Sequence, residues 1–511
     1  MKPQTFHRES LRHRYDVVVI GAGIGGLTAA ALLAHCGRSV LVIERHDRPG
    51  GYLHGFRRHG VQCDAGVHLV GGCAASGPPH RRALGMLVDA LGLTHRVRFL
   101  PVDPVARLVF PDRCLALPQG PEALRETLGA AFPSQCRGLG AFLDLAGRLA
   151  DEACRAAAGQ TGDLPVLTRY RQATLAAVLA EHCDDVRLRA VLAGLWPYLG
   201  LPPQRLSFLY WALMFMGYVR DGAGYCQGSF QRLADALAAS IGAAGGELLY
   251  RTGVRQILLG DDGRAAGVMT ETGQDIEAGV VIANADLRHT IEHLLPADRV
   301  PARYLARLRR LQPSLSAFVT YVGVGELPPD AAVHETFHYA GWDHERAHAA
   351  TCRGAPDWFS VTCPTHTDPT LSRDGGGLLM LTTLAPYRLS RDWRTLKPRF
   401  QERLLERAET RLPGLKARVR WLESGTPRTM ARYTLNHQGA AYGWAATPRQ
   451  VGPGRPAVQT PVPGLYLAGH WATPGGGVYG AALSGVMAAQ AILGIADQES
   501  LWRRVSGAAG G

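Results

Sequence analysis

The sequence predicts an α/β protein in which one domain holds a buried parallel sheet assembled from distant segments. A short β-branched run, YDVVVI at Tyr15–Ile20, is typical of a strand buried on both faces of such a sheet. Similar runs return at Val280–Ala283 and Gly464–Ala468, so the sheet draws on the start, middle and end of the chain. With 511 residues the chain also exceeds one ordinary core, which indicates two or more domains.

The segment from Tyr15 to Ile43 predicts a strand, a helix and a second parallel strand. Leu27–Cys36 is rich in helix-forming residues, and Gly37 stands where a helix C-cap belongs. Ser39–Ile43 (SVLVI) is the second buried strand. A parallel crossover needs a connection of about a dozen residues, and this segment has that length.

The rest of the chain alternates between helical and strand patterns. Arg81–Leu201 is expected to be mostly helical, and Ser229–Ala244 and Val478–Leu493 to be single helices. Tyr250–Ile282 alternates apolar runs with turn signals, which predicts a strand meander. Pro301–Arg420 mixes both patterns.

These patterns interleave the two domains along the chain. The segments expected to form the sheet-containing domain are 14–76, 222–296 and 455–495. The segments expected to form an α+β substrate domain are 77–221 and 297–454, with flexible termini at 1–13 and 496–511.

The turn after the first strand carries a phosphate-binding pattern. Gly21–Gly26 (GAGIGG) fits G-x-G-x-x-G, in which the glycines allow a tight turn, close approach of a pyrophosphate and close helix–strand packing. The pyrophosphate would lie at the following helix N-terminus. Glu44 ends the second strand, where a carboxylate can accept hydrogen bonds from a ribose. The pattern therefore predicts a Rossmann-like dinucleotide site, and Arg48 with Gly50 and Gly51 suits a second approach to the same cofactor.

Three separated motifs carry a family resemblance. ERHDRPGGYLHGF…CDAGVHLVGG resembles the phytoene desaturases, carotenoid isomerases and retinol saturase, and PVPGLYLAGHWATPGGGVYGAALSGVMAAQ is similar to the closing motif of that family. The middle segment, GSFQRLADAL…VVIANAD, resembles its adenine-side segment, with Val254 at the matching position. Many desaturases have Gly-Gly-Arg where this chain has Gly50-Gly51-Tyr52, whereas Asp64–His68 (DAGVH) looks more like the retinol saturase version.

The resemblance implies an FAD-binding, Rossmann-like domain of the GR2 or amine-oxidase type. The residues expected to contact FAD are Gly21, Gly23, Gly25, Gly26, Glu44, Arg45, Arg48, Gly50, Gly51, Tyr52, Val254, Gly469, His470, Gly476, Gly477 and Val478. One G-x-G-x-x-G fingerprint directly follows a predicted strand, so NAD(P)H as electron donor would visit the flavin's own pocket or be absent.

The resemblance also implies a substrate class, C=C bonds of a long hydrophobic polyene, of isoprenoid or polyketide type. Relatives saturate, desaturate, isomerise or reductively cyclise such molecules. The apolar run Leu206–Val219, with Trp211, Met214, Phe215 and Met216, would line a tunnel, contact a membrane or form plain helix core. The same alternatives hold for Trp196–Tyr198.

Three residues are candidates for catalytic groups near the flavin ring. His68 is the first, on its resemblance to the D-x-G-x-H pattern, and a histidine can donate, accept or carry a proton near neutral pH. Tyr442 and Trp444 in GAAYGW are the others. A structural role remains the alternative for each.

Two copies of H-E-x-x-H, at His334–His338 and His344–His348, match the zinc metalloprotease pattern. Zinc would need both histidines on one face of a helix and a third ligand. Neither copy is flanked by a clear amphipathic helix pattern, so we expect no metal site.

Composition limits the partners. The chain carries a net charge of +12, but its basic residues, nearly all Arg, are scattered rather than clustered, which argues against a nucleic-acid protein. Attraction of a basic surface to an anionic membrane stays open. The ten Cys form no C-x-x-C pair, and no secretory signal or 20-residue apolar run is present. These features favour a cytoplasmic protein with reduced thiols.

Two other functions remain as alternatives. One is a flavin amine oxidase on the same architecture. The other is a binding module like the GDP-dissociation inhibitors of small GTPases, which share a related fold. The Arg48–Gly51 segment and the glycine-rich closing motif argue against the binding module, because neither motif would have a role without a flavin.

Overall fold

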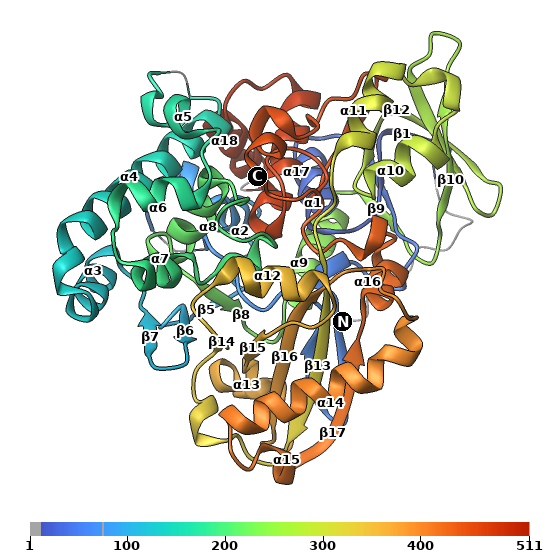
Figure 1. The fold of residues 1–511 in the computed structure, drawn as a ribbon. Coiled ribbons are helices and arrows are strands. Elements are labelled where there is room, and N and C mark those ends of the chain that lie inside the picture. Colours follow the sequence, from blue (N-terminus) through green and yellow to red (C-terminus); the bar gives the residue numbers. More distant parts are fainter. Residues whose placement is uncertain (1–11, 74–75, 161, 510–511) are drawn as a thin grey trace.

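Two mixed sheets and a group of helices make up the computed structural model, which describes residues 12–73, 76–160 and 162–509 (Figure 1). The first sheet has the order β10-β11-β12-β1-β2-β9, and β18 pairs with β12. Its strands are β1 (Arg14–Ile20), β2 (Val40–Ile43), β9 (Glu247–Leu249), β10 (Val254–Leu259), β11 (Ala265–Thr270), β12 (Asp275–Ala283) and β18 (Leu465–Leu467). The expected strands at both ends and in the middle of the chain therefore lie in one sheet.

Parallel pairing places the glycine-rich turn at the carboxyl edge of this sheet. β1 pairs in parallel with both β2 and β12, with Ile20 opposite Ile43 and Ala283. The four residues of β2 are all buried, as the continuous apolar run predicts. Ligands of open parallel sheets bind outside the carboxyl ends of the strands, so this edge is where a cofactor is expected.

Small residues let the first helix pack closely against the closing helix. α1 (Ile24–His35) begins three residues earlier than the sequence suggests, inside the glycine motif, and contacts α17 (Gly477–Leu493). A Cβ at Gly485 in α17 would lie 2.2 Å from the Gly25 carbonyl oxygen. Only glycine allows this approach, which fixes the closing motif beside the glycine-rich turn. On its other side α1 contacts α9 (Gln231–Ala243).

The second sheet has the order β17-β13-β16-β15-β14-β6-β7. Its strands are β6 (Ala106–Val109), β7 (Cys114–Leu117), β13 (Ser316–Val324), β14 (Glu335–Tyr339), β15 (Trp358–Thr362), β16 (Gly377–Ala385) and β17 (Val419–Gly425). The long helix α14 (Trp393–Arg411) crosses this sheet, and its Trp393, Phe400 and Leu404 join a core cluster with strand residues such as Phe318 (Figure 1). The other helices between β12 and β18 in sequence are α10 (Leu287–His289), α11 (Ala302–Arg310), α12 (His344–Cys352), α13 (Pro364–Thr367), α15 (Leu415–Arg418) and α16 (Pro427–Thr434).

A group of helices lies in the segment between β2 and β9 of the first sheet in sequence (Figure 1). Its members are α2 (Ala83–Ala90), α3 (Pro121–Ala131), α4 (Cys136–Ala157), α5 (Pro165–Tyr170), α6 (Leu175–His182), α7 (Val186–Ala193) and α8 (Phe208–Val219). The segment is less uniformly helical than expected, because it also contributes β6, β7 and β5 (Phe99–Pro101). These short strands pair with distant ones, β5 with β8 (Gly224–Cys226) and β6 with β14, and a local pattern carries no signal for such partners. A further hairpin joins β3 (Gly55–Arg58) to β4 (Val61–Asp64).

The C-terminal segment is folded, which corrects the expectation of a flexible tail at 496–511. Gln498–Ala509 forms α18, and its Leu501, Trp502 and Val505 are buried. Most of the expected flexible N-terminus falls on residues 1–11, outside the described part of the chain. All ten cysteines are free thiols.

Among the described helices, no single one is long and apolar enough to cross a membrane; α17 and α18 pass that test only as a pair, bent by 83°.

Candidate functional site

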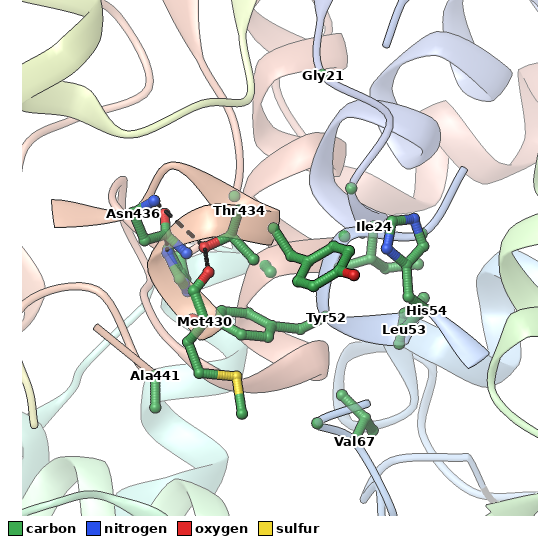
Figure 2. Close-up of a pocket in the computed structure, with 18 of the residues that line it drawn as sticks. Gly21, Ile24, Tyr52, Leu53, His54, Val67, Met430, Thr434, Asn436 and Ala441 are labelled. Atoms are coloured by element: carbon green, nitrogen blue, oxygen red, sulfur yellow. Dashed lines mark hydrogen bonds between the residues drawn. The ribbon is translucent and has the colours of Figure 1, made fainter. Parts of the chain in front are cut away.

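A cavity of about 370 Å³ opens at the carboxyl ends of β1 and β2, between the first sheet and residues of the second. Figure 2 shows how distant segments meet there: Ile24 and Tyr52, near the start of the chain, face Met430 and Thr434 from α16. The Thr434 hydroxyl donates to the Met430 carbonyl and accepts from the Asn436 amide, which holds the turn after α16 against the cavity.

The glycine-rich turn has a shape that only glycine permits. Gly21 has a φ of +94°, and its N–H donates to the Ile43 carbonyl at 2.8 Å, which joins the two strand ends. A Cβ at Gly25 would lie 2.4 Å from the Gly469 nitrogen. The turn, the helix and the closing motif are therefore in backbone contact, and no side chain fills the space in front of them.

The N-terminus of α1 suits an anion. No side chain caps it, and the glycines before and within its first turn, Gly21, Gly23 and Gly25, line the cavity. The first N–H groups of a helix lack intrahelical partners, and they and the helix dipole favour a negative group. This backbone fits the pyrophosphate of a dinucleotide.

Glu44 is fixed where a ribose would lie. Its side chain is almost fully buried, and its two carboxylate oxygens accept from the backbone N–H groups of Ala22 and His46, each at 2.8 Å. A carboxylate has about four acceptor positions, so two remain for the ribose hydroxyls. Glu44 therefore joins the glycine turn to the ribose site.

The structure places most of the expected cofactor residues around this one cavity. Those that line it are Gly21, Gly23, Gly25, Glu44, Arg45, Gly50, Gly51, Tyr52, Val254, Gly469, His470, Gly477 and Val478. Gly26 lies behind the turn, where a Cβ would meet the Gly21 carbonyl oxygen at 2.4 Å. Gly476 lines a second cavity. Arg48 lines a surface groove instead, and its guanidinium pairs with Asp47 at 3.0 Å.

One residue of this site escaped the sequence interpretation. Asn284 follows β12, lines the cavity and donates from its side-chain amide to the Gly21 carbonyl at 3.1 Å. A Cβ at Gly469 would lie 2.6 Å from its Oδ1. Asn284 therefore links the first turn to the closing motif. Its position directly after a buried strand, in VVIANAD, was the available signal.

A second, larger cavity of about 890 Å³ adjoins the first. Apolar residues of α4 and α8 form much of its wall, among them Ala153, Leu209, Leu213 and Met214. The charged residues that line it are Arg81, Arg171, Arg307, Arg455 and Asp221. Tyr198, Tyr442, Gly477 and Val478 line both cavities, so these four residues mark the junction.

The apolar run Leu206–Val219 forms an inner wall. Its residues are buried or half-buried. The residues that meet the cavity are partly different from those expected: Met214 lines it, whereas Trp211 and Phe215 stack on each other in the core at 4.5 Å. Met216 is buried as well and does not line the cavity. The helix therefore serves as tunnel wall on one face and as core on the other.

Two of the three candidate catalytic residues lie at the junction. His68 lines the first cavity, and Tyr442 lines both while donating its hydroxyl to the Pro197 carbonyl at 3.0 Å. Trp444 does not line either cavity. Its fully buried indole donates to the Trp471 carbonyl at 3.0 Å, which gives it a packing position behind the site.

The two H-E-x-x-H copies lie in different kinds of secondary structure. His334 directly precedes β14 and His338 lies in it, and four residues of strand separate side chains by about 13 Å, too far to share one zinc ion. The second copy does lie on a helix, α12, contrary to expectation. There His344 donates from Nε2 to the Ala190 carbonyl and accepts from the Trp196 indole, so both ring nitrogens are occupied. Within the described residues, no group of three His, Cys, Asp or Glu could hold a metal.

Comparisons with known proteins agree with this geometry. The model of the family "Flavin containing amine oxidoreductase" matches residues 24–493. All-trans-retinol 13,14-reductase of Rattus norvegicus is 29% identical, over 91% of this chain and 84% of its own length. Prolycopene isomerase 2 of an Oncidium hybrid cultivar is 28% identical, over 94% of this chain and 84% of its own.

Solved structures share the fold at lower identity. An oxidoreductase from Methanosarcina mazei has a TM-score of 0.62 at 21% identity, with 92% of this chain and 99% of that chain covered. Putrescine oxidase bound to putrescine has a TM-score of 0.63 at 17% identity, with 94% and 99% covered. The chain belongs to the flavin-containing amine oxidoreductase family, and it is a flavin-dependent oxidoreductase whose cofactor is FAD.

Proposed function

We propose that this chain acts on the C=C bonds of a long apolar polyene, with FAD in the first cavity and the polyene in the second. The observation that carries the proposal is the junction. The apolar cavity meets the cofactor cavity at Tyr198, Tyr442, Gly477 and Val478, so an apolar chain held there would reach the cofactor end-on. The relatives named as a retinol reductase and prolycopene isomerases support the same substrate class.

Different residues of the chain would bind the cofactor and align the substrate. The uncapped α1 N-terminus would hold the pyrophosphate and Glu44 the ribose, while Tyr52, His470 and Val478 would border the flavin ring. The flavin supplies hydride or electron transfer when bound. The apolar wall of α4 and α8 would exclude water and align the polyene, so that one double bond lies at the junction.

Amine oxidation is the weaker alternative for this cavity. A substrate amine is cationic near neutral pH, whereas four of the five charged residues that line the larger cavity are arginines. Its one carboxylate, Asp221, already pairs with Arg220 at 2.9 Å and with Arg81 at 3.6 Å. A neutral apolar substrate, or one with an anionic end, fits this lining better than an amine does.

We propose that the electron donor reaches the flavin through the first cavity. One G-x-G-x-x-G, Gly21–Gly26, directly follows a strand, whereas the second match, Gly475–Gly480, lies in the closing motif of the same site, and the described part of the chain forms one sheet of parallel character around them. NAD(P)H is the candidate donor. Bleaching of the yellow protein by NAD(P)H under anaerobic conditions would support this proposal. A protein that dithionite bleaches but NAD(P)H does not would contradict it.

Product analysis tests the substrate class. The purified yellow protein would be incubated without oxygen with all-trans-retinol or a carotenoid, with and without dithionite, and in parallel with putrescine in air. We expect a polyene product with two more or two fewer hydrogen atoms, or an isomer of unchanged mass, and no hydrogen peroxide from putrescine. Peroxide release with putrescine and an unchanged polyene would overturn the proposal in favour of an amine oxidase.

A further inference from the structure

A buried carboxyl group lies directly behind the junction of the two cavities. Glu335, the first residue of β14, is fully buried. Its Oε2 lies 3.3 Å from His68 Nε2, and the same nitrogen lies 3.3 Å from the Tyr198 hydroxyl. His68 lines the first cavity and Tyr198 lines both. Three titratable groups thus lie together behind the place where the cavities meet, with His68 Nε2 between Glu335 Oε2 and the Tyr198 hydroxyl.

No positive side chain compensates Glu335. In the part of the chain that the structure describes, no Arg or Lys pairs with it, and Thr362 donates to its Oε2 at 2.6 Å. The other oxygen, Oε1, is buried without a hydrogen-bond partner. An isolated buried carboxylate is costly, so the carboxyl keeps its proton instead. Burial raises the pKa of Glu335 to about 8, and the hydrogen bond from Thr362 offsets this only in part.

The groups around Glu335 are uncharged near neutral pH. Burial lowers the pKa of His68 to about 4 and that of the adjoining His334 to about 3. Burial also raises the pKa of each tyrosine that faces Glu335, and these are Tyr198, Tyr218, Tyr339 and Tyr442. Glu335 is therefore the acidic proton of the cluster, and a neutral carboxylic acid of this kind can act as a proton donor at pH 7.

We propose that Glu335, His68 and Tyr198 form a proton relay between the protein interior and the double bond of the substrate. The inference deepens the proposed function and rests on it. It assigns Tyr198 as the group that touches the substrate, and His68 and Glu335 as the groups that resupply its proton. None of the three acts as a metal ligand, which gives the glutamate of the first H-E-x-x-H copy a different role.

The step balances as follows for a saturation. The π bond of the substrate breaks, and its two carbons gain one hydride, for which the reduced flavin is the source, and one proton. The proton comes from the Tyr198 hydroxyl; His68 Nε2 accepts the proton of Glu335 Oε2 and passes a proton on to the Tyr198 oxygen, so the ring is neutral again at the end. Glu335 ends as a carboxylate that solvent later reprotonates. In a desaturation the proton travels the same path in reverse.

Two variants and a matched control test the relay. E335Q keeps the size of the side chain and one acceptor oxygen but has no acidic proton, and Y198F removes the terminal donor. E345Q alters the glutamate at the same place in the second H-E-x-x-H copy. Glu345 accepts from the Gln204 N–H at 2.8 Å and lines neither cavity. We expect single-turnover polyene conversion to fall about tenfold or more in E335Q and Y198F, since a positioned proton donor contributes about a hundredfold or more. E345Q should match the unmodified protein.

The pH profile separates a proton role from a packing role. In the saturating direction the unmodified protein and E345Q should lose rate as pH rises through about 8, where Glu335 loses its proton, and E335Q should lack that limb. A wild-type rate and profile in E335Q would overturn the relay. If E335Q does not fold, an unchanged rate in Y198F would overturn it instead.

Infrared spectroscopy gives a readout that does not depend on turnover. The carbonyl stretch of a protonated buried carboxyl should be present at pH 7 in the unmodified protein and E345Q, weaken above pH 8, and be absent from E335Q. Absence of this band from the unmodified protein at pH 7 would overturn the relay. Polyene left unconverted by the unmodified protein would overturn the proposed function, whatever the infrared result.

Discussion

The two cavities share four lining residues, but one is bordered mainly by backbone and the other mainly by side chains. The first is bordered by backbone: glycines at strand ends and helix starts, with the carboxylate of Glu44 held by two amides. The second is bordered by side chains of α4 and α8, which are mainly apolar. The first therefore recognises polar groups at fixed positions, whereas the second recognises length and apolar surface.

This difference determines how each cavity tolerates change. Backbone contacts at Gly25 leave no room for any side chain, because a Cβ there would meet the nitrogen of Gly469. In the second cavity, by contrast, nothing lies within 4 Å of a Cβ built at Gly217 in α8. A substitution should therefore abolish ligand binding in the first cavity and reshape it in the second.

The largest effect is expected at Gly25. Gly25→Val would press on the backbone of the closing motif, and overpacking of this kind costs about 3 kcal/mol, roughly a hundredfold in flavin affinity. We expect a colourless protein, measured by visible absorption and by calorimetry with added FAD. Gly242→Ala, on an exposed turn of α9 with open space around it, is the control and should stay yellow. A yellow Gly25→Val protein would show that the backbone contact is dispensable.

A smaller effect is expected at Gly217, in the second cavity. Gly217→Trp would fill part of the apolar cavity without touching the glycine-rich turn. We expect conversion of a long polyene to fall about tenfold, the size of loss that a badly fitting apolar contact gives, with an unchanged flavin spectrum. A shortened polyene should suffer less. Equal losses for long and short polyenes would mean that the larger cavity does not hold the substrate.

The smallest effect concerns the packing of Trp196, two residues before Tyr198, which lines both cavities. His344→Leu would leave the Trp196 indole and the Ala190 carbonyl without partners, at about 1–3 kcal/mol of unfolding free energy at pH 7. His348→Leu is the comparison, because the His348 ring lies 3.7 Å from the weakly bonding Cys352 thiol and packs edge-on against Trp196 at 5.8 Å, and its loss should cost less. Chemical denaturation measures both. Equal losses, together with bound zinc in the unmodified protein, would favour a metal site instead.

The same histidine gives a pH dependence of stability. Burial lowers the pKa of His344 to about 4 in the folded chain, below its ordinary value near 6.5, because the fold favours the neutral ring. Its contribution to stability is therefore present above pH 6.5 and is lost as pH falls from 6.5 toward 4. The gap in unfolding free energy between the unmodified protein and His344→Leu should narrow over that range.

The first sheet and its cofactor turn could be predicted from the sequence because their signals are local. A β-branched run, a glycine pattern and an acid at a strand end lie within the first 44 residues, and each constrains its own backbone. The short strands β5 and β6 could not be predicted in the same way, since β5 pairs with β8 and β6 with β14, which lie far away in sequence. The H-E-x-x-H pattern, for which we expected no metal site, shows the opposite limit: the same five-residue motif forms part of a strand in one copy and of a helix in the other.

The sequence alone determined the class of cofactor, because the geometry of a pyrophosphate site depends on which residues lack a side chain, and glycine can be read directly from the chain. The tertiary structure decided the chemistry at the substrate. It brings both Glu335 Oε2 and the Tyr198 hydroxyl to 3.3 Å from His68 Nε2, from three distant segments, and within the described residues it buries Glu335 without an Arg or Lys partner. The proton affinity of a carboxyl depends on that burial, and burial is a property of the packed fold rather than of any motif.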